Sequence, residues 1–450
     1  MSDSRDLTTG PVWRSLLIIA GPMVFGILAA ISVSVVDTYY VGKLGTAPLA
    51  ALSFIAPASL TITSLAIGLS AGASSVVARA IGSSDTSEAK RLSTDSLGLA
   101  LVVVVLITVT GYLTIKPLFS LLGAEGDVLD MIVRYMQIWY LSMPFLIIPM
   151  VANAIVRAVG NSFWPSAIMV ASAIINIAIT PAFIFGWGPI PALNIEGAAW
   201  GTLIARVFTL FLGLWLIVYR EEMVAFAKPT IEELVKSWRQ VLSIGLPAAF
   251  GNATNPLGIT VVTGIVAIYG EAVVAGFGVA TRIESLAVIP MLALSSAIGP
   301  VAGQNWGAAK VERVRSALKI SFAVCFGWAL LLAVVFQFFA ESVIGLFSSD
   351  PEVMRAAASY LHIVPLSVWG YGWVIVAAGG YNSLGKPFTG LGMYLTRTAL
   401  FYIPLSYAAS LLSGSQSVFS AIAIANTIAG AAVGFYSLWW LRKNGEEAAG

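Results

Sequence analysis

Long apolar stretches recur along almost the entire chain, and they limit the folds open to it more than any other feature. A helix that crosses a bilayer needs about 20 consecutive, mostly apolar residues, and by that measure we count about twelve candidate spans. They lie near 15–38, 47–73, 92–115, 128–152, 165–186, 196–219, 240–268, 273–299, 316–340, 352–378, 389–411 and 417–440. The sequence therefore predicts an all-α, polytopic membrane protein.

The composition indicates that lipid, rather than water, surrounds most of the chain. Apolar residues make up 58% of the 450 residues and charged residues 10%, whereas charged residues are about 25% of an ordinary soluble chain. The first apolar stretch is too long for a cleavable signal peptide and lacks a small-residue cleavage site. We therefore expect it to remain as the first span.

Several classes of function are disfavoured by the residues that the chain lacks. One cysteine, Cys325, and one histidine, His362, leave no internal disulfide and no metal site built from clustered histidines and cysteines. The sequence has neither a phosphate-binding Walker loop nor a Ser-His-Asp set, so we expect a protein that is not an enzyme and needs no cofactor. A net charge of +2 without a basic run argues against a nucleic-acid partner.

The positive charges indicate an orientation in the membrane. If the N-terminus is cytoplasmic, twelve spans place the C-terminus in the cytoplasm as well. Most of the 24 lysines and arginines then fall in cytoplasmic turns and at the termini, as the positive-inside rule predicts. Arg206, Arg282 and Arg397 remain within predicted spans. We predict a multi-pass protein of the cell membrane, inner or plasma, with both termini cytoplasmic.

The two halves of the chain match each other at a constant offset of 225 residues. Each half holds six predicted spans, so both share one orientation and are expected to be related by an axis along the membrane normal. The predicted organisation is an N-terminal six-helix lobe over 1–219, a cytoplasmic linker helix over 220–240 and a C-terminal six-helix lobe over 241–450. The matched pairs are Pro22 with Pro247, Gly26 with Gly251, Gly45 with Gly270, Gly82 with Gly307, Lys90 with Arg315, Tyr135 with Tyr360, and Gly160 with Gly385.

A helix start is predicted in the segment between the halves. Thr230 is placed to act as the N-cap, with Glu233 as its partner in a capping box. Ile231, Leu234 and Trp238 then fall on one face of the helix. We predict a short helix that lies on the cytoplasmic surface and acts mainly as a spacer.

Charged side chains within the predicted spans need a reason, because a carboxylate there costs about 2.5–3.5 kcal/mol on insertion scales. Asp37, late in the first span, is either a functional acid or a residue at the outer interface beside Tyr39 and Tyr40, which would form an aromatic belt. Its position does not separate these alternatives. Arg282 and Glu284 lie two residues apart in the eighth span and do not share a helix face. For both we predict structural ion pairs with partners elsewhere.

Neutral polar side chains accompany Asp37 in the first half. Asn153, Asn176, Thr180 and Thr202 lie in the fourth, fifth and sixth predicted spans, and Asn176 and Thr180 share a helix face. Carboxylate, amide and hydroxyl groups are suitable for binding Na+ or for holding a proton. Hydrogen bonds between neighbouring helices are the alternative explanation for these residues.

Characteristic motifs occur in both halves of the chain. In the first half they are Gly21-Pro-Met, Val36-Asp-Thr-Tyr-Tyr-Val-Gly, Gly68-Leu-Ser-Ala-Gly-Ala, Asn153-Ala-Ile-Val-Arg-Ala-Val-Gly-Asn, Asn176-Ile-Ala-Ile-Thr-Pro-Ala-Phe-Ile-Phe and Gly197-Ala-Ala-Trp-Gly-Thr. In the second half they include Ala280-Thr-Arg-Ile-Glu-Ser-Leu and Val301-Ala-Gly-Gln-Asn-Trp-Gly-Ala. Together these motifs resemble the multidrug and toxic compound extrusion (MATE) transporters, over nearly the whole chain. Within that family the chain is most similar to the DNA-damage-inducible branch, because its seventh span holds no carboxylate and its tenth holds none beyond Glu352 at its first position.

The resemblance implies two six-helix lobes around a central cavity and export of organic, often cationic and amphipathic, drugs or metabolites in exchange for inward Na+ or H+. It places the cation site in the first lobe, where Asp37 and Asn176 would bind Na+ if Na+ is the coupling ion. Thr180 stands where the related branch often has a second aspartate, which leaves the choice between Na+ and H+ open. The residues at matching positions are Asp37, Asn176, Thr180 and Thr202, with Tyr135 and Asn153 in the surrounding network and Glu284 and Arg282 as charged candidates in the second lobe.

Two other functions remain as alternatives. A flippase for lipid-linked oligosaccharides or other lipids, from the same superfamily, would need several basic residues for pyrophosphate, and only Arg206, Arg282 and Arg397 are available within spans. A scaffold or channel without coupled transport is disfavoured by the intramembrane Asp37 and by prolines inside several spans. For an exporter, the expected partners are small-molecule substrates and membrane lipids, and a monomer is expected.

Overall fold

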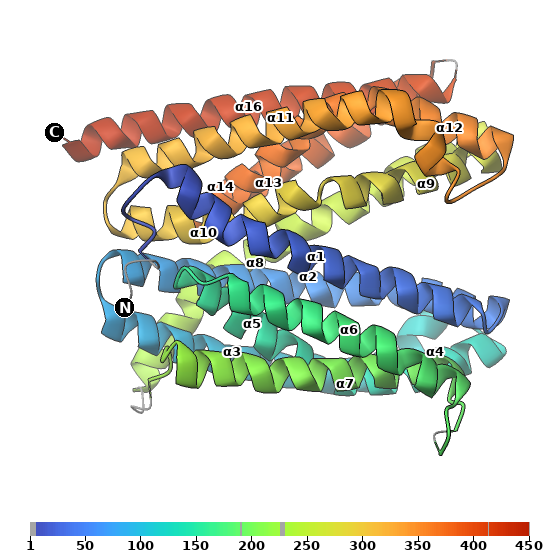
Figure 1. Cartoon of the computed structure of the whole chain (residues 1–450), viewed down its shortest axis with the longest axis horizontal. Coiled ribbons are helices and arrows are strands. Elements are labelled where there is room, and N and C mark those ends of the chain that lie inside the picture. Colours follow the sequence, from blue (N-terminus) through green and yellow to red (C-terminus); the bar gives the residue numbers. More distant parts are fainter. Residues whose placement is uncertain (1–5, 190, 226–229, 413, 450) are drawn as a thin grey trace. The chain divides into compact units, whose positions relative to one another are not determined.

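The computed structural model describes residues 6–189, 191–225, 230–412 and 414–449, most of which are helical. Figure 1 shows long helices joined by short turns in both halves of the chain. The helices are α1 (Val12–Gly42), α2 (Thr46–Gly82), α3 (Thr86–Leu121), α4 (Gly126–Leu141), α5 (Pro144–Ala158), α6 (Phe163–Phe185), α7 (Asn194–Trp215), η2 (Leu216–Arg220), α8 (Ile231–Val266), η3 (Ala267–Tyr269), α9 (Glu271–Ala287), α10 (Ile289–Gly307), α11 (Val311–Ile344), α12 (Pro351–Ile363), η4 (Pro365–Ser367), α13 (Val368–Ser383), α14 (Pro387–Leu395), η5 (Thr396–Tyr402), α15 (Ile403–Ser410) and α16 (Ser415–Ala449).

These helices form a fold that crosses the membrane many times. Among the described residues, nine helices are long and apolar enough to span a bilayer, and two bent pairs raise the number to as many as eleven. A further helical run, α14–η5–α15, is continuous over 387–410 but contains a π-helical stretch. By length and composition the described residues support nine to eleven spans, and this run lies where the eleventh of the twelve predicted spans is expected. The all-α polytopic fold class is confirmed.

Each bent pair is interrupted by a proline at the start of its second helix. The α4–α5 pair is bent by 42° and the α9–α10 pair by 45°. Pro144 begins α5, and Pro290 lies in the first turn of α10. Proline has no N–H to donate and its ring clashes with the preceding turn, so the helix bends there. At the first bend the Ser142 hydroxyl donates to the Trp139 carbonyl at 2.7 Å, which satisfies one carbonyl near the break.

The chain divides into two compact units. The first unit comprises Gly21–Leu246, and the second comprises Asp6–Ala20 together with the chain from Pro247 onward. The divisions therefore fall inside α1 and α8, beside Pro22 and Pro247, which are mates in the 225-residue repeat. Residues 6–20 belong with the second unit, and Leu7 is buried in its core.

The segment between the two halves differs in part from its prediction. The capping box is confirmed, because the Thr230 N–H and hydroxyl both donate to Glu233 Oε2 at 2.9 Å and the Glu233 N–H donates back to Thr230 Oγ1. The separate surface helix is not observed: α8 begins at Ile231 and continues without a break to Val266. No proline lies between Ile231 and Pro247 to end the helix in the predicted linker. Lys228 and Pro229 lie outside the described residues.

Small residues bring α2 and α8 into close contact within the first unit. A Cβ added at Gly72 would lie 2.4 Å from the Val241 carbonyl oxygen, and one added at Gly245 would lie 3.0 Å from the Gly68 carbonyl oxygen. Gly68 and Gly72 are four residues apart and share a helix face. Close backbone packing of this kind is a main source of helix association in lipid, where water does not drive helices together.

We expect Gly72→Ala to lower the thermal stability of the purified protein, because the added methyl group forces the α8 backbone away from α2. Overpacking of this kind costs about 1–3 kcal/mol. Gly98→Ala in α3 is the control, since a Cβ added there meets nothing within 4 Å. The fraction of protein that stays monodisperse after heating measures the difference. Identical melting midpoints for the two variants would contradict the predicted contact.

Candidate functional site

Asp37 lies near the end of α1, and its carboxylate is only partly satisfied. The Oδ1 atom is buried and has no hydrogen-bond partner among the described residues. The carboxylate is within hydrogen-bonding reach of the Thr202 hydroxyl and interacts electrostatically with the Arg206 guanidinium. Thr202 and Arg206 are four residues apart on α7, so one face of that helix is directed toward Asp37. Tyr39, by contrast, is 59% exposed. The α1 face that carries Tyr39 is therefore exposed, whereas Asp37 is directed into the first unit.

Two residues of α6 face the same part of α7. The Asn176 Nδ2 donates a hydrogen bond to the Thr202 Oγ1 at 3.2 Å. A Cβ added at Gly201 would collide with the Thr180 hydroxyl, so that hydroxyl is directed at the residue next to Thr202. The Asn176 Oδ1 and the Thr180 Oγ1 are both buried and without hydrogen-bond partners among the described residues.

Tyr135 belongs to this group, and no hydrogen bond in the described part of the chain links the Asn153 Oδ1 to it. Tyr135 on α4 is 9% exposed and interacts electrostatically with Asp37 and Arg206. Asn153 is buried in α5 with its Oδ1 unpartnered, but the described residues that interact with Asp37 do not include it. We call the group that the structure brings together the Asp37 cluster. It consists of Asp37, Tyr135, Asn176, Thr180 and Thr202.

Two further charged residues lie within predicted spans, and one of them, Arg206, interacts with Asp37. Arg206 donates from its Nη1 to the Ser142 hydroxyl at 2.5 Å, and its guanidinium lies 5.7 Å from the centre of the Trp139 ring. Its spacing of four residues from Thr202 is the signal that places it on the same face. Asp95 in α3 is 3% exposed and its Oδ2 is unpartnered among the described residues. It is the single acid in the predicted span 92–115, which is the signal that indicates it.

The Asp37 cluster is chemically suited to a hard cation or a proton. Three buried oxygens lack partners among the described residues, one each on Asp37, Asn176 and Thr180. Buried polar atoms in folded proteins nearly always have a hydrogen-bond partner. Carboxylate, amide and hydroxyl oxygens are also the ligands that hard cations take. The first unit thus contains, in one group of helices, the oxygen types that bind small hard cations.

Arg282 and Glu284 do not form the ion pairs predicted for them. Glu284 Oε2 instead accepts a hydrogen bond from the Tyr360 hydroxyl at 2.5 Å. Arg282 is exposed, and neither side chain takes part in an ion pair in the described part of the chain. Two positions along a helix turn the side chain by about 200°, so α9 directs Glu284 into the second unit and Arg282 out of it.

Arg397 is the charged centre of the second unit. Its Nε donates to Asn426 Oδ1 at 2.9 Å and its Nη1 donates to Asn255 Oδ1 at 2.8 Å. The guanidinium lies 4.4 Å from the centre of the Tyr371 ring and 4.9 Å from that of Tyr402. Amide oxygens and aromatic faces hold this charge, which is 5% exposed.

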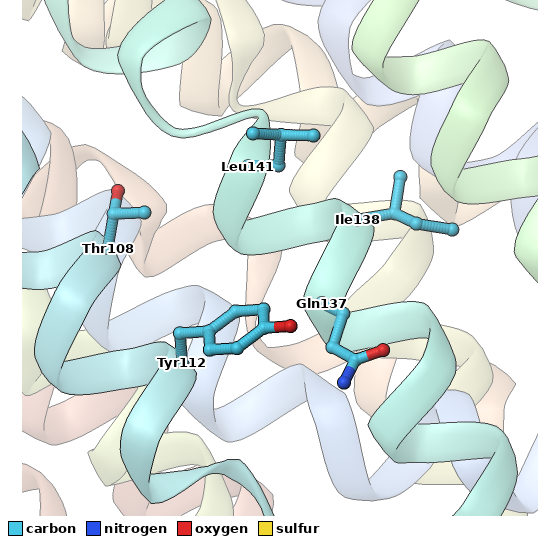
Figure 2. Close-up of a pocket in the computed structure, with 5 residues that line it drawn as sticks. All are labelled: Thr108, Tyr112, Gln137, Ile138 and Leu141. Atoms are coloured by element: carbon cyan, nitrogen blue, oxygen red, sulfur yellow. The ribbon is translucent and has the colours of Figure 1, made fainter.

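A groove of about 340 Å³ lies between α3 and α4, away from the Asp37 cluster. Figure 2 shows the Tyr112 ring reaching from α3 toward the Gln137 side chain on α4. Gln137 follows Tyr135 by two residues and so points to another face of α4. The groove contains none of the site residues predicted from the sequence; its lining is Thr108, Tyr112, Gln137, Ile138 and Leu141.

The duplicated helices agree with the match to one protein family. The MatE family model matches residues 22–182 and again residues 247–408. This chain belongs to the MatE family. The two matches start 225 residues apart, at 22 and 247, which is the offset of the internal repeat. The MATE fold is thus present here as two copies of one unit.

Similar proteins show what MATE members of this kind do. The chain is 36% identical over 432 residues to the FAD transporter of Shewanella oneidensis, and the match covers 96% of each chain. It is 25% identical over 434 residues to the multidrug export protein MepA of Staphylococcus aureus, covering 93% of this chain and 92% of MepA. The crystal structure of the Vibrio cholerae MATE transporter VcmN in the bent form matches with a TM-score of 0.90 and 28% identity, covering 97% and 98% of the two chains. The chain is therefore a MATE-type membrane transporter and not an enzyme.

Arg397→Met is expected to destabilise the second unit, because it leaves Asn255 and Asn426 without their charged donor. Hydrogen bonds to charged groups contribute about 1.5–3 kcal/mol each, so the loss is on the order of 3 kcal/mol or more. Arg282→Met is the matched control, since Arg282 is exposed on the same unit. Thermal unfolding of the two purified variants measures the difference. A drop in midpoint for Arg282→Met as large as that for Arg397→Met would refute the assignment.

Proposed function

We propose that this chain is a secondary active antiporter, which exports organic compounds while Na+ or H+ flows inward through the Asp37 cluster. The observation that carries the proposal is the set of three buried oxygens without partners, on Asp37, Asn176 and Thr180. A buried acceptor without a donor costs about 1–3 kcal/mol. A site that retains three such atoms is stabilised by any cation or proton that fills it, and the coupling ion is proposed as that occupant.

The exporter is proposed to work by alternating access of two lobes, 1–219 and 241–450, joined through 220–240. The 225-residue repeat supports this division, because duplicated bundles in transporters commonly move against each other around a central site. The distribution of lysine and arginine supports cytoplasmic termini and insertion in the cell membrane. We infer a monomer as the working form, because one chain contains both lobes.

Two classes of organic substrate are favoured by different relatives. The FAD transporter is 36% identical over 96% of both chains, which favours FAD or a similar anionic dinucleotide. MepA, a multidrug export protein, is 25% identical and favours amphipathic cations. FAD is the first candidate because its transporter is the more similar of the two relatives. Ethidium serves as the test compound for the second class.

Asp37→Asn is expected to abolish ion-driven export. Asparagine keeps the size of the side chain but carries no negative charge and takes up no proton in this range of pH. The purified protein is reconstituted into proteoliposomes, and efflux of FAD or ethidium is followed while a Na+ gradient and a pH gradient are imposed separately. Wild-type protein should respond to one gradient, and the Asp37→Asn variant to neither.

Asp127→Asn is the matched control for this experiment. Asp127 lies in the first turn of α4 and is exposed, so its loss should leave efflux unchanged. Wild-type rates in the Asp37→Asn variant would exclude Asp37 as the coupling site. Efflux that proceeds equally without any ion gradient would indicate a channel, and translocation of labelled lipid in the same vesicles would indicate a flippase.

Thr180→Asp tests which ion the cluster accommodates. A second carboxylate beside Asn176 strengthens the attraction for a cation. If Na+ is the coupling ion, the Na+ concentration at half-maximal efflux should fall about tenfold, which corresponds to about 1.4 kcal/mol. If H+ is the coupling ion, the pH of half-maximal efflux should rise, because two carboxylates in one site share a tightly held proton. Thr180→Ser, which adds no charge, is the control, and a Thr180→Asp protein with the same ion dependence as this control would show that Thr180 lies outside the ion site.

A further inference from the structure

We propose that Arg206 is a tethered cation that competes with the coupling ion for Asp37. In this proposal the Ser142 hydroxyl, at the α4–α5 bend, holds the guanidinium while the ion occupies the cluster. The inference rests on the proposed function, because it concerns how the ion enters and leaves the Asp37 cluster.

The first observation is that two opposite charges stand close together without pairing. Asp37 and Arg206 interact electrostatically, yet no ion pair within 4.0 Å joins them in the described part of the chain. The Asp37 Oδ1 stays unpartnered as a result. Opposite charges attract strongly in apolar surroundings, so a rotation of the long arginine side chain toward Asp37 would give Oδ1 a donor.

The second observation is that few hydrogen bonds hold the Arg206 guanidinium in its present position. Its hydrogen bond to Ser142 is the one that the described residues give it, and the Trp139 ring lies 5.7 Å away. Ser142 is 1% exposed and ends α4 at the bend. A guanidinium has five N–H donors, so most of them remain available to a carboxylate.

The third observation comes from the second copy of the repeat, where a serine at the matching bend shares a hydrogen-bond network with an arginine, although Arg206 and Arg397 are not mates in the repeat. Ser142 corresponds to Ser367 at the offset of 225. Ser367 accepts a hydrogen bond from Asn426 Nδ2 at 3.3 Å, and Asn426 also holds Arg397. The first copy has Gly201 at the position of Asn426, so it lacks the amide that could fix an arginine beside the bend.

The carboxylates of the two copies differ in the same way. Tyr360 donates to Glu284 and satisfies it, whereas its mate Tyr135 interacts with Asp37 without a hydrogen bond to Oδ1. The second copy thus has a hydrogen-bonded acid and an arginine with two amide partners, and the first copy has a partly unsatisfied acid and an arginine with one hydrogen bond. In the first copy, Asp37 and Arg206 are therefore able to exchange hydrogen-bonding partners.

This exchange of partners by Arg206 has two consequences for transport. When the ion leaves, the guanidinium neutralises Asp37, so the empty cluster does not hold an isolated charge in the membrane. When the guanidinium moves to Asp37, it releases Ser142, so the occupancy of the cluster is communicated to the α4–α5 bend. The charged and titratable groups that face Asp37 are Arg206 from α7 and Tyr135 from α4, while α6 contributes neutral groups.

Two substitutions should shift the apparent ion affinity in opposite directions. Arg206→Gln removes the competitor, so the concentration of the driving cation at half-maximal efflux should fall at least about tenfold, and the maximal rate should fall because ion release slows. Ser142→Ala removes the hydroxyl that accepts the hydrogen bond from the guanidinium, so the cation concentration at half-maximal efflux should rise several-fold. Arg134→Gln is the matched control on α4, because Arg134 forms its ion pair with Glu196 at 2.8 Å, and it should behave as wild type.

The measurement is efflux from proteoliposomes as a function of the Na+ or H+ concentration, whichever drives the wild-type protein. An unchanged half-maximal concentration in Arg206→Gln, or a shift of both variants in one direction, would overturn the competition between Arg206 and the ion. If Arg206→Gln does not fold, the rise expected for Ser142→Ala decides alone, and a fall or no change overturns the proposal. If Asp37→Asn is inactive but Arg206→Gln and Arg134→Gln show equal ion affinities, this inference fails. The proposed antiport function then still stands. A fully active Asp37→Asn defeats the proposed function and this inference together.

Discussion

The interaction on which the first unit depends is that of one buried carboxylate with groups that do not fully satisfy it. A carboxylate at membrane depth costs about 2.5–3.5 kcal/mol on insertion scales, so the surrounding helices must compensate for it in part. Helix α7 brings Thr202 and Arg206 to Asp37. Helix α6 approaches α7 closely at Gly201, because glycine leaves room for the Thr180 side chain. The compensation remains incomplete at Asp37 Oδ1, and the proposed role of the coupling ion is to complete it.

The backbone is duplicated, but the acidic residues of the two copies are not at equivalent positions. Tyr135 and Tyr360 are mates in the repeat, and each lies beside one acid and near one arginine. The acids are not mates, however, because the position equivalent to Asp37 holds Val262. In the second unit Asn255 and Asn426 hold Arg397 firmly. We interpret the second unit as the rigid copy and the first unit as the copy that exchanges ions.

Much of the fold follows from the sequence because lipid imposes simple rules. Apolar length predicts the spans, and the capping box at Thr230 is set by two residues three positions apart. Local rules could not show that α8 runs through the predicted linker, or that α1 is divided between the two units near Pro22. Both depend on contacts between residues far apart in the chain, such as the packing of Gly72 against Val241.

The candidate site was predicted in its residue types but not in its connections. Spacing shows that Asn176 and Thr180 share a face, but not that this face meets Gly201 on α7. Likewise, nothing in the sequence pairs Glu284 with Tyr360 rather than with a cation. Helical periodicity assigns a side chain to a face, whereas the partner across that face is decided by how helices pack.

The most direct test of the account is whether substrate can drive the ion in reverse. Coupling in an antiporter is reciprocal, so an outward gradient of FAD or ethidium should drive uptake of Na+ or H+ into proteoliposomes against the gradient of that ion. Cation uptake that requires both the substrate gradient and the Asp37 carboxylate is the predicted result. Substrate that leaves the vesicles without any uptake of either cation would contradict the account.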